Sequence, residues 1–186
     1  VQTEADRLAA LLEDLLALSR IEQDAGGDLA VEPVSLEALA HEALDACGAA
    51  ARDKGVTLTL SESQDVEVPV HRTLLVQALV NLLDNAVKYS DPGTCTRLSF
   101  ERIDDDAFVH VVDEGHGISG EHLPRLFERF YRVDRGRSRA LGGTGLGLAI
   151  AKHIARAHHG DVEVQSTPGQ GSRFTIRIPL SGGTPS

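Results

Sequence analysis

One helical pattern, from about Thr73 to Tyr89, restricts the possible folds more than any other stretch of the chain. Apolar residues recur there at spacings of three and four, which predicts a helix with one face buried in a core. The same helix carries Asn81 and Asn85, whose spacing places both amides on one stripe of its surface. Such amides either bond neighbouring backbone or face a ligand, and the pattern alone leaves both interpretations open.

The segments around this helix alternate between helix and strand patterns. Further helices are predicted from a cap at Ser35 to about Lys54, around Glu121 to Phe130, and from Thr144 to His159. Strands are predicted, in chain order, for VTLTLSE, VEVPV, TRLSFERI, AFVHVVDEG, DVEVQST and SRFTIRIPL. Turns are expected at Asp104-Asp105-Asp106 and Gly169-Gln170-Gly171. We therefore expect an α/β (α+β) two-layer sandwich, with one mixed, largely antiparallel sheet and helices on one face.

The N-terminal segment is predicted to be a separate unit. From Val1 to about Asp24, leucines form a coiled-coil or bundle seam that is too short to be stable without a partner helix. An amphipathic helix packed on its own domain is the alternative. The sequence thus predicts a bundle helix over 1–24, a linker over 25–34, a globular domain over 35–180 and a disordered tail over 181–186. Since the chain has no methionine, we expect it to be a piece of a longer protein, with a valine start codon as the alternative.

Composition narrows the classes of function. The net charge of −10 argues against a nucleic-acid partner, because a phosphate backbone attracts a basic surface. Residues 125–139 nevertheless hold six arginines against Glu128 and Asp134, and a glycine-rich segment follows, which favours a small polyanion as ligand. Cys47 and Cys95 are too few for a disulfide framework or a metal knuckle, so a cytoplasmic setting is expected. No apolar run approaches the ~20 residues of a membrane helix, which leaves an upstream anchor as the only expected link to a membrane.

Three loop motifs carry the remaining chemistry. DEGHGIS starts at Asp113, directly after a strand, and its glycines allow a close approach to a ligand whose exocyclic amine could donate to the carboxylate. LFERFYR, from Leu126 to Arg132, places two scarce phenylalanines in one turn. GGTGLGLAI, which begins at Gly142, offers free backbone N–H groups and a helix dipole to an anion. Taken singly, each motif also has a purely structural interpretation. DEGHGIS could be a plain turn, LFERFYR a helix docked by its aromatic face, and GGTGLGLAI a flexible hinge.

In this order, the four stretches resemble the ATP-binding domain of sensor histidine kinases. NLLDNAVKY is similar to the N box, DEGHG to the G1 box, LFERFYR to the F box and GTGLGLAI to the G2 box. TPGQGSRFTIRIP fits this domain as well, and RLAALLEDLLALSRIE resembles the end of the second helix of the dimerisation and phosphoacceptor domain. The resemblance implies binding of ATP and Mg²⁺ and transfer of the γ-phosphoryl group to a histidine on an upstream domain. It further implies a homodimer through the upstream bundle, and a response regulator receiver domain as the next acceptor.

The resemblance also implies roles for particular residues. Asn85 is expected to bind Mg²⁺, and Lys88 and Arg132 are expected to act on the phosphates as the catalytic residues. Tyr89 is expected to lie against the adenine, and Asp113 to accept a hydrogen bond from its N6 amine. The full set of nucleotide-binding residues expected from the resemblance is Asn81, Asn85, Lys88, Tyr89, Asp113, Gly115, Gly117, Ile118, Arg129, Arg132, Gly143, Thr144, Gly145, Leu146, Gly147 and Leu148.

The chain departs from the family pattern at two places. His71 stands where the family usually has an aspartate before the N-box helix, so Thr73 is expected to cap that helix instead. The phosphoacceptor motif is missing, and His41, which begins like it, is expected to be an ordinary surface histidine. Asn81 replaces the glutamate that acts as general base in gyrase-type, mismatch-repair and chaperone ATPases, so fast hydrolysis is not expected. A non-catalytic nucleotide-sensing module and an anti-sigma-type serine kinase are the alternatives.

Residues 134–143 are expected to form a lid that nucleotide orders. The segment combines arginines, which repel one another, with glycines, which lose much conformational entropy on ordering. A triphosphate would offset both costs.

Overall fold

The computed structural model describes residues 12, 16, 29–61, 64–133 and 143–180 of the 186-residue chain. Its elements are β1 (Glu32–Ser35), α2 (Leu36–Lys54), β2 (Thr57–Leu60), β3 (Glu67–Val70), α3 (Arg72–Tyr89), β4 (Cys95–Ile103), β5 (Asp106–Asp113), η1 (Leu123–Arg125), α5 (Gly147–Ala157), β6 (Asp161–Thr167) and β7 (Gly171–Pro179). Strands β2, β4, β5, β7 and β6 form a five-stranded sheet in that spatial order. β2 and β4 run parallel, and the other neighbours in this sheet are antiparallel.

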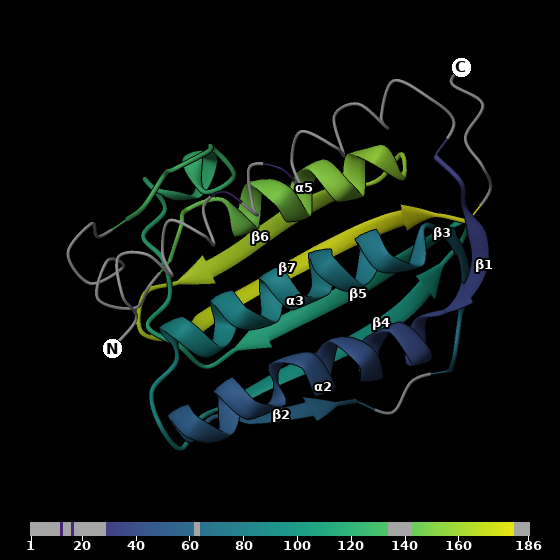
Figure 1. Ribbon diagram of the computed structural model, residues 1–186. Helices are drawn as coiled ribbons and strands as arrows, with labels where there is room; N and C mark the ends of the chain where they lie inside the picture. Colours follow the sequence, from purple (N-terminus) through teal and green to yellow (C-terminus); the bar gives the residue numbers. More distant parts are fainter. Residues whose placement is uncertain (1–11, 13–15, 17–28, 62–63, 134–142, 181–186) are drawn as a thin grey trace.

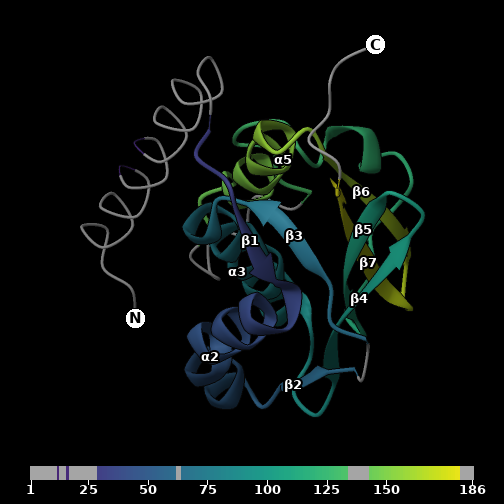
Figure 2. The same ribbon diagram turned by 90° about the vertical axis from the view of Figure 1, so that its right-hand side faces the viewer.

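Helices α2, α3 and α5 cover one face of this sheet (Figure 1, and from the side in Figure 2). α3 lies in the middle, between α2 and α5. Leu79, Leu82 and Leu83 of α3 are at most 1% exposed and share one core with Val111 and Phe174 of the sheet. The predicted two-layer sandwich, with a mixed and largely antiparallel sheet, is confirmed.

Both ends of α2 are closed as its sequence predicts. The Ser35 side chain accepts a hydrogen bond from the N–H of Ala38 at 3.0 Å, which confirms the predicted cap. At the other end Gly55 adopts the left-handed conformation, with φ at 73°, and its N–H bonds carbonyls of the last turn.

The start of α3 differs from the prediction. Thr73 lies inside the helix, and the residue at the cap position, His71, makes no side-chain capping bond. The prediction that Thr73 caps this helix is therefore wrong. The His71 backbone N–H donates instead to Nε2 of His158, at 2.9 Å, from the end of α5. A partner that lies 87 residues away along the chain leaves no local signal.

The first strand and the third strand form a small sheet of their own. β1 and β3 pair in antiparallel register with Pro33 opposite Pro69, so the expectation of a single sheet is wrong. Neither proline has an N–H group to donate to the ladder between these two strands. β1 also occupies the last part of the segment predicted to be a linker, while the predicted domain boundaries remain a prediction.

Two predicted helix boundaries are wrong near the glycine-rich segments. Only Leu123–Arg125 is helical between Glu121 and Phe130, as one 3₁₀ turn, because Phe130 has φ at 63° and its N–H bonds the carbonyl of Gly145 at 2.9 Å. α5 begins at Gly147, not at Thr144, since the residues before it make that loop contact.

Three predicted features fall mainly or wholly outside the described residues. Leu12 and Leu16 are helical and exposed, and the rest of the predicted bundle helix lies beyond what the structure describes. The predicted lid, apart from Gly143, and the predicted tail also lie outside it. In the described ranges, no helix combines the length and the apolar character needed to cross a membrane.

Candidate functional site

A pocket lies at the end of α3. This end of the helix is on the left-hand side of Figure 1. The end of β5, the loop after it and the first turn of α5 complete the walls of the pocket. Its empty volume, including the part open to solvent, is about 820 Å³. The lining residues are Asn85, Tyr89, Asp113, His116, Gly117, Ile118, Leu126, Val133, Leu148 and Ser172.

Asp113 is the buried acid of this pocket. It is the last residue of β5 and is 5% exposed. Its Oδ1 accepts hydrogen bonds from the backbone N–H of Gly115 at 2.9 Å and of Ser172 at 3.2 Å. Burial raises the pKa of the Asp113 carboxyl above its usual value of 3.8, and the two N–H donors oppose that rise. The fold therefore holds a carboxylate against a desolvation cost, which a ligand that donates to it would reduce.

At its two glycines, the loop after Asp113 approaches its neighbours too closely for a side chain. A Cβ on Gly115 would lie 2.6 Å from the carbonyl oxygen of Tyr89. Gly117 has φ at 67°, and a Cβ there would lie 2.0 Å from the carbonyl oxygen of Thr167. The turn is thus present. Packing requires both glycines, and the left-handed conformation also requires Gly117.

Some of the predicted site residues of α3 line the pocket and others do not. Asn85 and Tyr89 line the pocket. Asn81, one turn earlier, lies against the start of α5, where its Oδ1 is 3.6 Å from the position a Cβ on Gly147 would take. Among the described residues its buried Nδ2 has no hydrogen-bond partner. Lys88 does not line the pocket and pairs with Asp84 of the same helix at 2.6 Å.

The N-terminus of α5 faces this region without a cap. Leu146 stands at the cap position and makes no side-chain bond to the first turn, so the first backbone N–H groups have no partner within the helix. Leu146 is fully buried and Leu148 lines the pocket. Gly143 and Thr144 precede them, and the Thr144 hydroxyl accepts from the N–H of Leu146 at 3.2 Å. An open helix N-terminus beside a pocket favours a negatively charged ligand.

The predicted arginine-rich segment is described only in its first half. Arg125 pairs with Glu128 at 3.0 Å and lies 4.4 Å from the ring centroid of Tyr131. Arg129 is exposed, whereas Arg132 is partly buried and its Nε lies 3.4 Å from the position a Cβ on Gly145 would take. The structure therefore brings Arg132 to the glycine-rich loop and leaves Arg125 in a local cluster.

Four lining residues were not predicted from the sequence. These are His116, Leu126, Val133 and Ser172. Ser172 sits in the quoted stretch TPGQGSRFTIRIP, yet only the pairing of β5 with β7, which sets Asp113 opposite Ser172, brings it to the pocket. Of the predicted set, Asn85, Tyr89, Asp113, Gly117, Ile118 and Leu148 line the pocket.

Comparisons with known proteins agree with this geometry. Residues 70–182 match the family described as "Histidine kinase-, DNA gyrase B-, and HSP90-like ATPase". The chain is 40% identical to "Sensor-like histidine kinase SenX3" of Mycolicibacterium smegmatis, over 95% of this chain and 46% of that protein. It is 39% identical to "Phosphate regulon sensor protein PhoR" of Pseudomonas aeruginosa, over 96% of this chain and 40% of that protein.

Solved structures show the same similarity. The histidine kinase AdeS of Acinetobacter baumannii superposes with a TM-score of 0.76 at 29% identity, covering 94% of this chain and 79% of that one. Full-length ShkA in complex with AMPPNP gives a TM-score of 0.83 at 28% identity, covering 97% of this chain and 37% of that one. The chain spans less than half the length of the two curated relatives, at 46% and 40%. It belongs to the histidine kinase-, DNA gyrase B- and HSP90-like ATPase family and, within that family, to the ATP-binding domains of sensor histidine kinases.

Proposed function

We propose that this chain is the ATP-binding catalytic part of a two-component sensor histidine kinase. One observation carries the proposal, namely that a buried carboxylate, an amide-bearing helix and an uncapped helix N-terminus meet at one pocket. A nucleotide base, a phosphate-bound cation and the phosphates themselves need these three kinds of group. The related ShkA holds AMPPNP, an analogue of ATP, which supports the same ligand class here.

The adenine is assigned to the inner part of the pocket. Asp113 accepts the hydrogen bond of the N6 amine, which offsets part of the cost of burying the carboxylate. Gly115 and Gly117 keep the loop close to its neighbours, so that the base has room. Tyr89 and Ile118 supply apolar surface at the walls of the pocket.

The phosphates are assigned to the side of the pocket where α5 begins. The N–H groups from Gly145 to Leu148, with Gly143 and Thr144 before them, cradle the phosphates. Arg132, assisted by Arg129, reaches the γ-phosphate, and Lys88 exchanges its contact with Asp84 for a phosphate oxygen.

The residues present fit a phosphate-bound Mg²⁺ ion. Among the described residues no group of three or more histidine, cysteine or acidic side chains could hold a metal by itself. Mg²⁺ commonly takes one or two protein ligands beside water and phosphate oxygens, and the Asn85 amide oxygen suits that role, with Asn81 beside it. When bound, the ion would neutralise charge on the phosphates.

The phosphoryl acceptor is assigned to a histidine upstream of this chain. Its ring nitrogen forms a bond to the γ-phosphorus as the bond to the ADP oxygen breaks, and the phosphoryl group then passes to an aspartate of a response regulator. His41 is not assigned this role, because the residues after His41-Glu42 do not continue the phosphoacceptor motif. The same proposal divides the chain into a bundle helix, a linker, the ATP-binding domain and a tail, over 1–24, 25–34, 35–180 and 181–186. It also includes a dimer through the upstream bundle. The location is cytoplasmic, with membrane attachment only through an upstream anchor.

Two experiments test this proposal. Calorimetric titration with Mg·ATP should show reversible binding at one site, and an absence of heat with both ATP and ADP would contradict it. Incubation with γ-labelled ATP should leave this chain unlabelled, whereas an added histidine-containing bundle domain of the parent protein should gain acid-labile label. Fast ATP turnover by the chain alone, or label on His41, would also contradict it.

A further inference from the structure

We propose that His116 is a positioning residue, which fixes the distance between the aspartate loop and α3 and thereby sets the selectivity of the pocket for adenine. The inference rests on the proposed function, because it concerns how the same pocket holds its base. His116 lies between Gly115 and Gly117, and its side chain is 43% exposed at the pocket wall.

The contacts of His116 converge on the last carbonyl of α3. Its backbone N–H bonds the carbonyl oxygen of Tyr89 at 3.3 Å, and its Nδ1 lies 2.7 Å from the same oxygen. Since a carbonyl only accepts hydrogen bonds, Nδ1 must carry the hydrogen. Tyr89 ends α3, so its carbonyl has no donor within the helix. The imidazole therefore supplies the shorter of the two bonds that hold the loop on this helix.

This bond joins the two elements whose separation defines the pocket. Asp113 begins the loop, and Asn85 and Tyr89 lie in the last two turns of α3. On its other side the loop is tied to the β6–β7 turn, because the N–H of Gly169 donates to the carbonyl of His116 at 2.7 Å. Without the Nδ1–H donor, the loop would be held on α3 by the 3.3 Å backbone bond.

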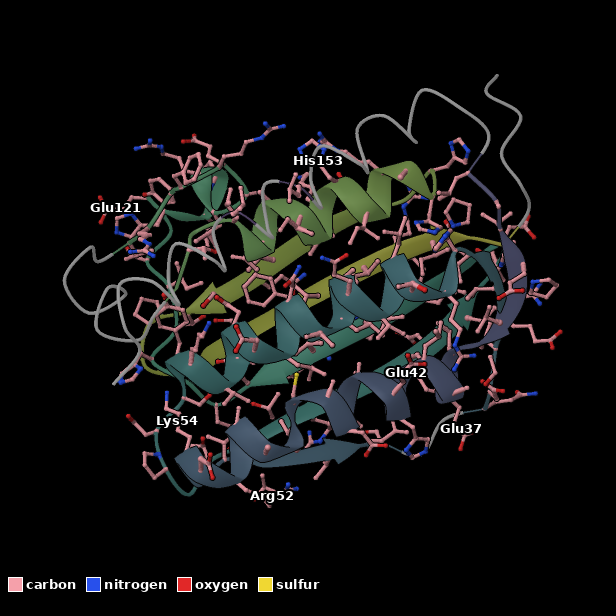
Figure 3. All side chains as sticks on the ribbon, in the orientation of Figure 1. Glu37, Glu42, Arg52, Lys54, Glu121 and His153 are labelled. Carbon is pink, nitrogen blue, oxygen red and sulfur yellow. The ribbon has the colours of Figure 1, made fainter. Side chains whose placement is uncertain are left out.

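A second side chain holds the neighbouring carbonyl from outside the pocket. Lys54, at the end of α2, donates to the carbonyl oxygen of Lys88, and Figure 3 shows it at this end of the helices. Nε2 of His116 also lies 3.4 Å from Oδ1 of Asp91, just after α3. The end of α3 is thus fixed by Lys54 and His116, and of these two only His116 lines the pocket.

The test compares ATP with ITP, which carries an oxygen in place of the N6 amine. If His116 positions Asp113 against that amine, His116→Leu should weaken ATP binding by about tenfold, as expected for one lost hydrogen bond, and change ITP binding little. The preference for ATP should therefore fall. His116→Asn, whose amide N–H can take the place of Nδ1–H, should restore most of it. If the leucine variant does not fold, His116→Gln, whose amide lies one carbon further out, should show the same loss of preference.

His158→Asn is the matched control. His158 also bonds a backbone carbonyl through Nδ1, at 2.7 Å from Ile154, but it does not line the pocket. This control should lower the Tm and leave the ATP-to-ITP ratio unchanged. An unchanged ratio in the His116 variants, or an equal loss of both nucleotides, would overturn the inference while the proposed function stands. A wild-type chain that binds neither nucleotide would overturn both.

Discussion

A titratable side chain is buried near each end of helix α3, and the two side chains have different hydrogen-bond partners. His158, at the end where α3 begins, and Asp113, at the end where α3 stops, are each 5% exposed. His158 donates from Nδ1 to the carbonyl of Ile154 and accepts at Nε2 from the N–H of His71. Asp113 accepts two N–H bonds, and both of them end on Oδ1. His158 thus has partners within the protein for both ring nitrogens, whereas Asp113 lines a pocket that can take a ligand.

This difference predicts that one end of α3 contributes to stability and the other to ligand binding. Burial lowers the pKa of His158 below its usual 6.5 and thereby favours the neutral ring that its two bonds require. Burial raises the pKa of Asp113, so the fold opposes the charge that the proposed ligand needs. We infer that substitutions at the His158 end change stability alone, and that substitutions at the Asp113 end change ligand binding even where stability is kept.

The largest expected effect is that of a methyl group on a crowded glycine. Gly117→Ala would place a Cβ 2.0 Å from the carbonyl oxygen of Thr167, and Gly160→Ala would place one 1.9 Å from that of Arg177. Each should cost at least about 3 kcal/mol in urea unfolding, because backbone must move. At a temperature where both fold, only Gly117→Ala should also lose nucleotide binding.

Gly169→Ala is the steric control for these variants. Gly169 has φ at 79°, but a Cβ there would meet nothing within 4 Å, so the expected cost is only that of the left-handed conformation, about 1 kcal/mol. A cost for Gly117→Ala as small as that for Gly169→Ala would show that the loop has room, and the comparison between the two ends would fail.

The next effect is a pH dependence at the His158 end. Because the folded pKa of His158 is lowered, the unfolded chain binds more protons between that pKa and 6.5. The contribution of neutral His158 to the free energy of unfolding is therefore complete above pH 6.5. It is lost as the pH falls below 6.5, by up to about 1.4 kcal/mol per pH unit. Urea unfolding from pH 7.5 to 5 should show this slope, and His158→Asn should flatten it. The same slope in both proteins would assign the dependence to other groups.

The smallest effect concerns the lysine near the pocket. Asp84→Asn removes the partner of Lys88, and since both side chains are about a third or more exposed, it should change stability by no more than ~0.5 kcal/mol. Lys88→Met should weaken binding of ATP more than binding of adenosine, if Lys88 meets phosphate. Equal weakening of the two ligands would remove Lys88 from the phosphate contacts.

The sandwich and the main pocket walls were predictable because their signals are local. The spacing of apolar residues in α3 fixed which side is buried, and Ser35 marked the start of α2 through a bond to a residue three positions away. The motifs that resemble a histidine kinase named Asn85, Tyr89 and Asp113, which all line the pocket.

The features that were missed depend on contacts between distant segments. The His71 N–H finds its partner in His158, and Ser172 reaches the pocket through strand pairing with β5. α5 starts late because Gly145 bonds Phe130 across the loop. No periodicity or turn signal encodes such partners, so the exact helix starts and the remaining four lining residues of the pocket required the structure.

Asp113→Asn tests the central claim most directly. The asparagine Oδ1 can keep both N–H bonds, but the second side-chain atom becomes an NH₂ donor and cannot accept from the adenine amine. The variant should bind Mg·ATP more weakly by about 1–3 kcal/mol, roughly tenfold or more, while its stability at pH 7 stays equal or rises because a buried charge is removed. Calorimetry and urea unfolding on the same preparation would measure both. Unchanged affinity, or affinity and stability that fall together, would contradict the account.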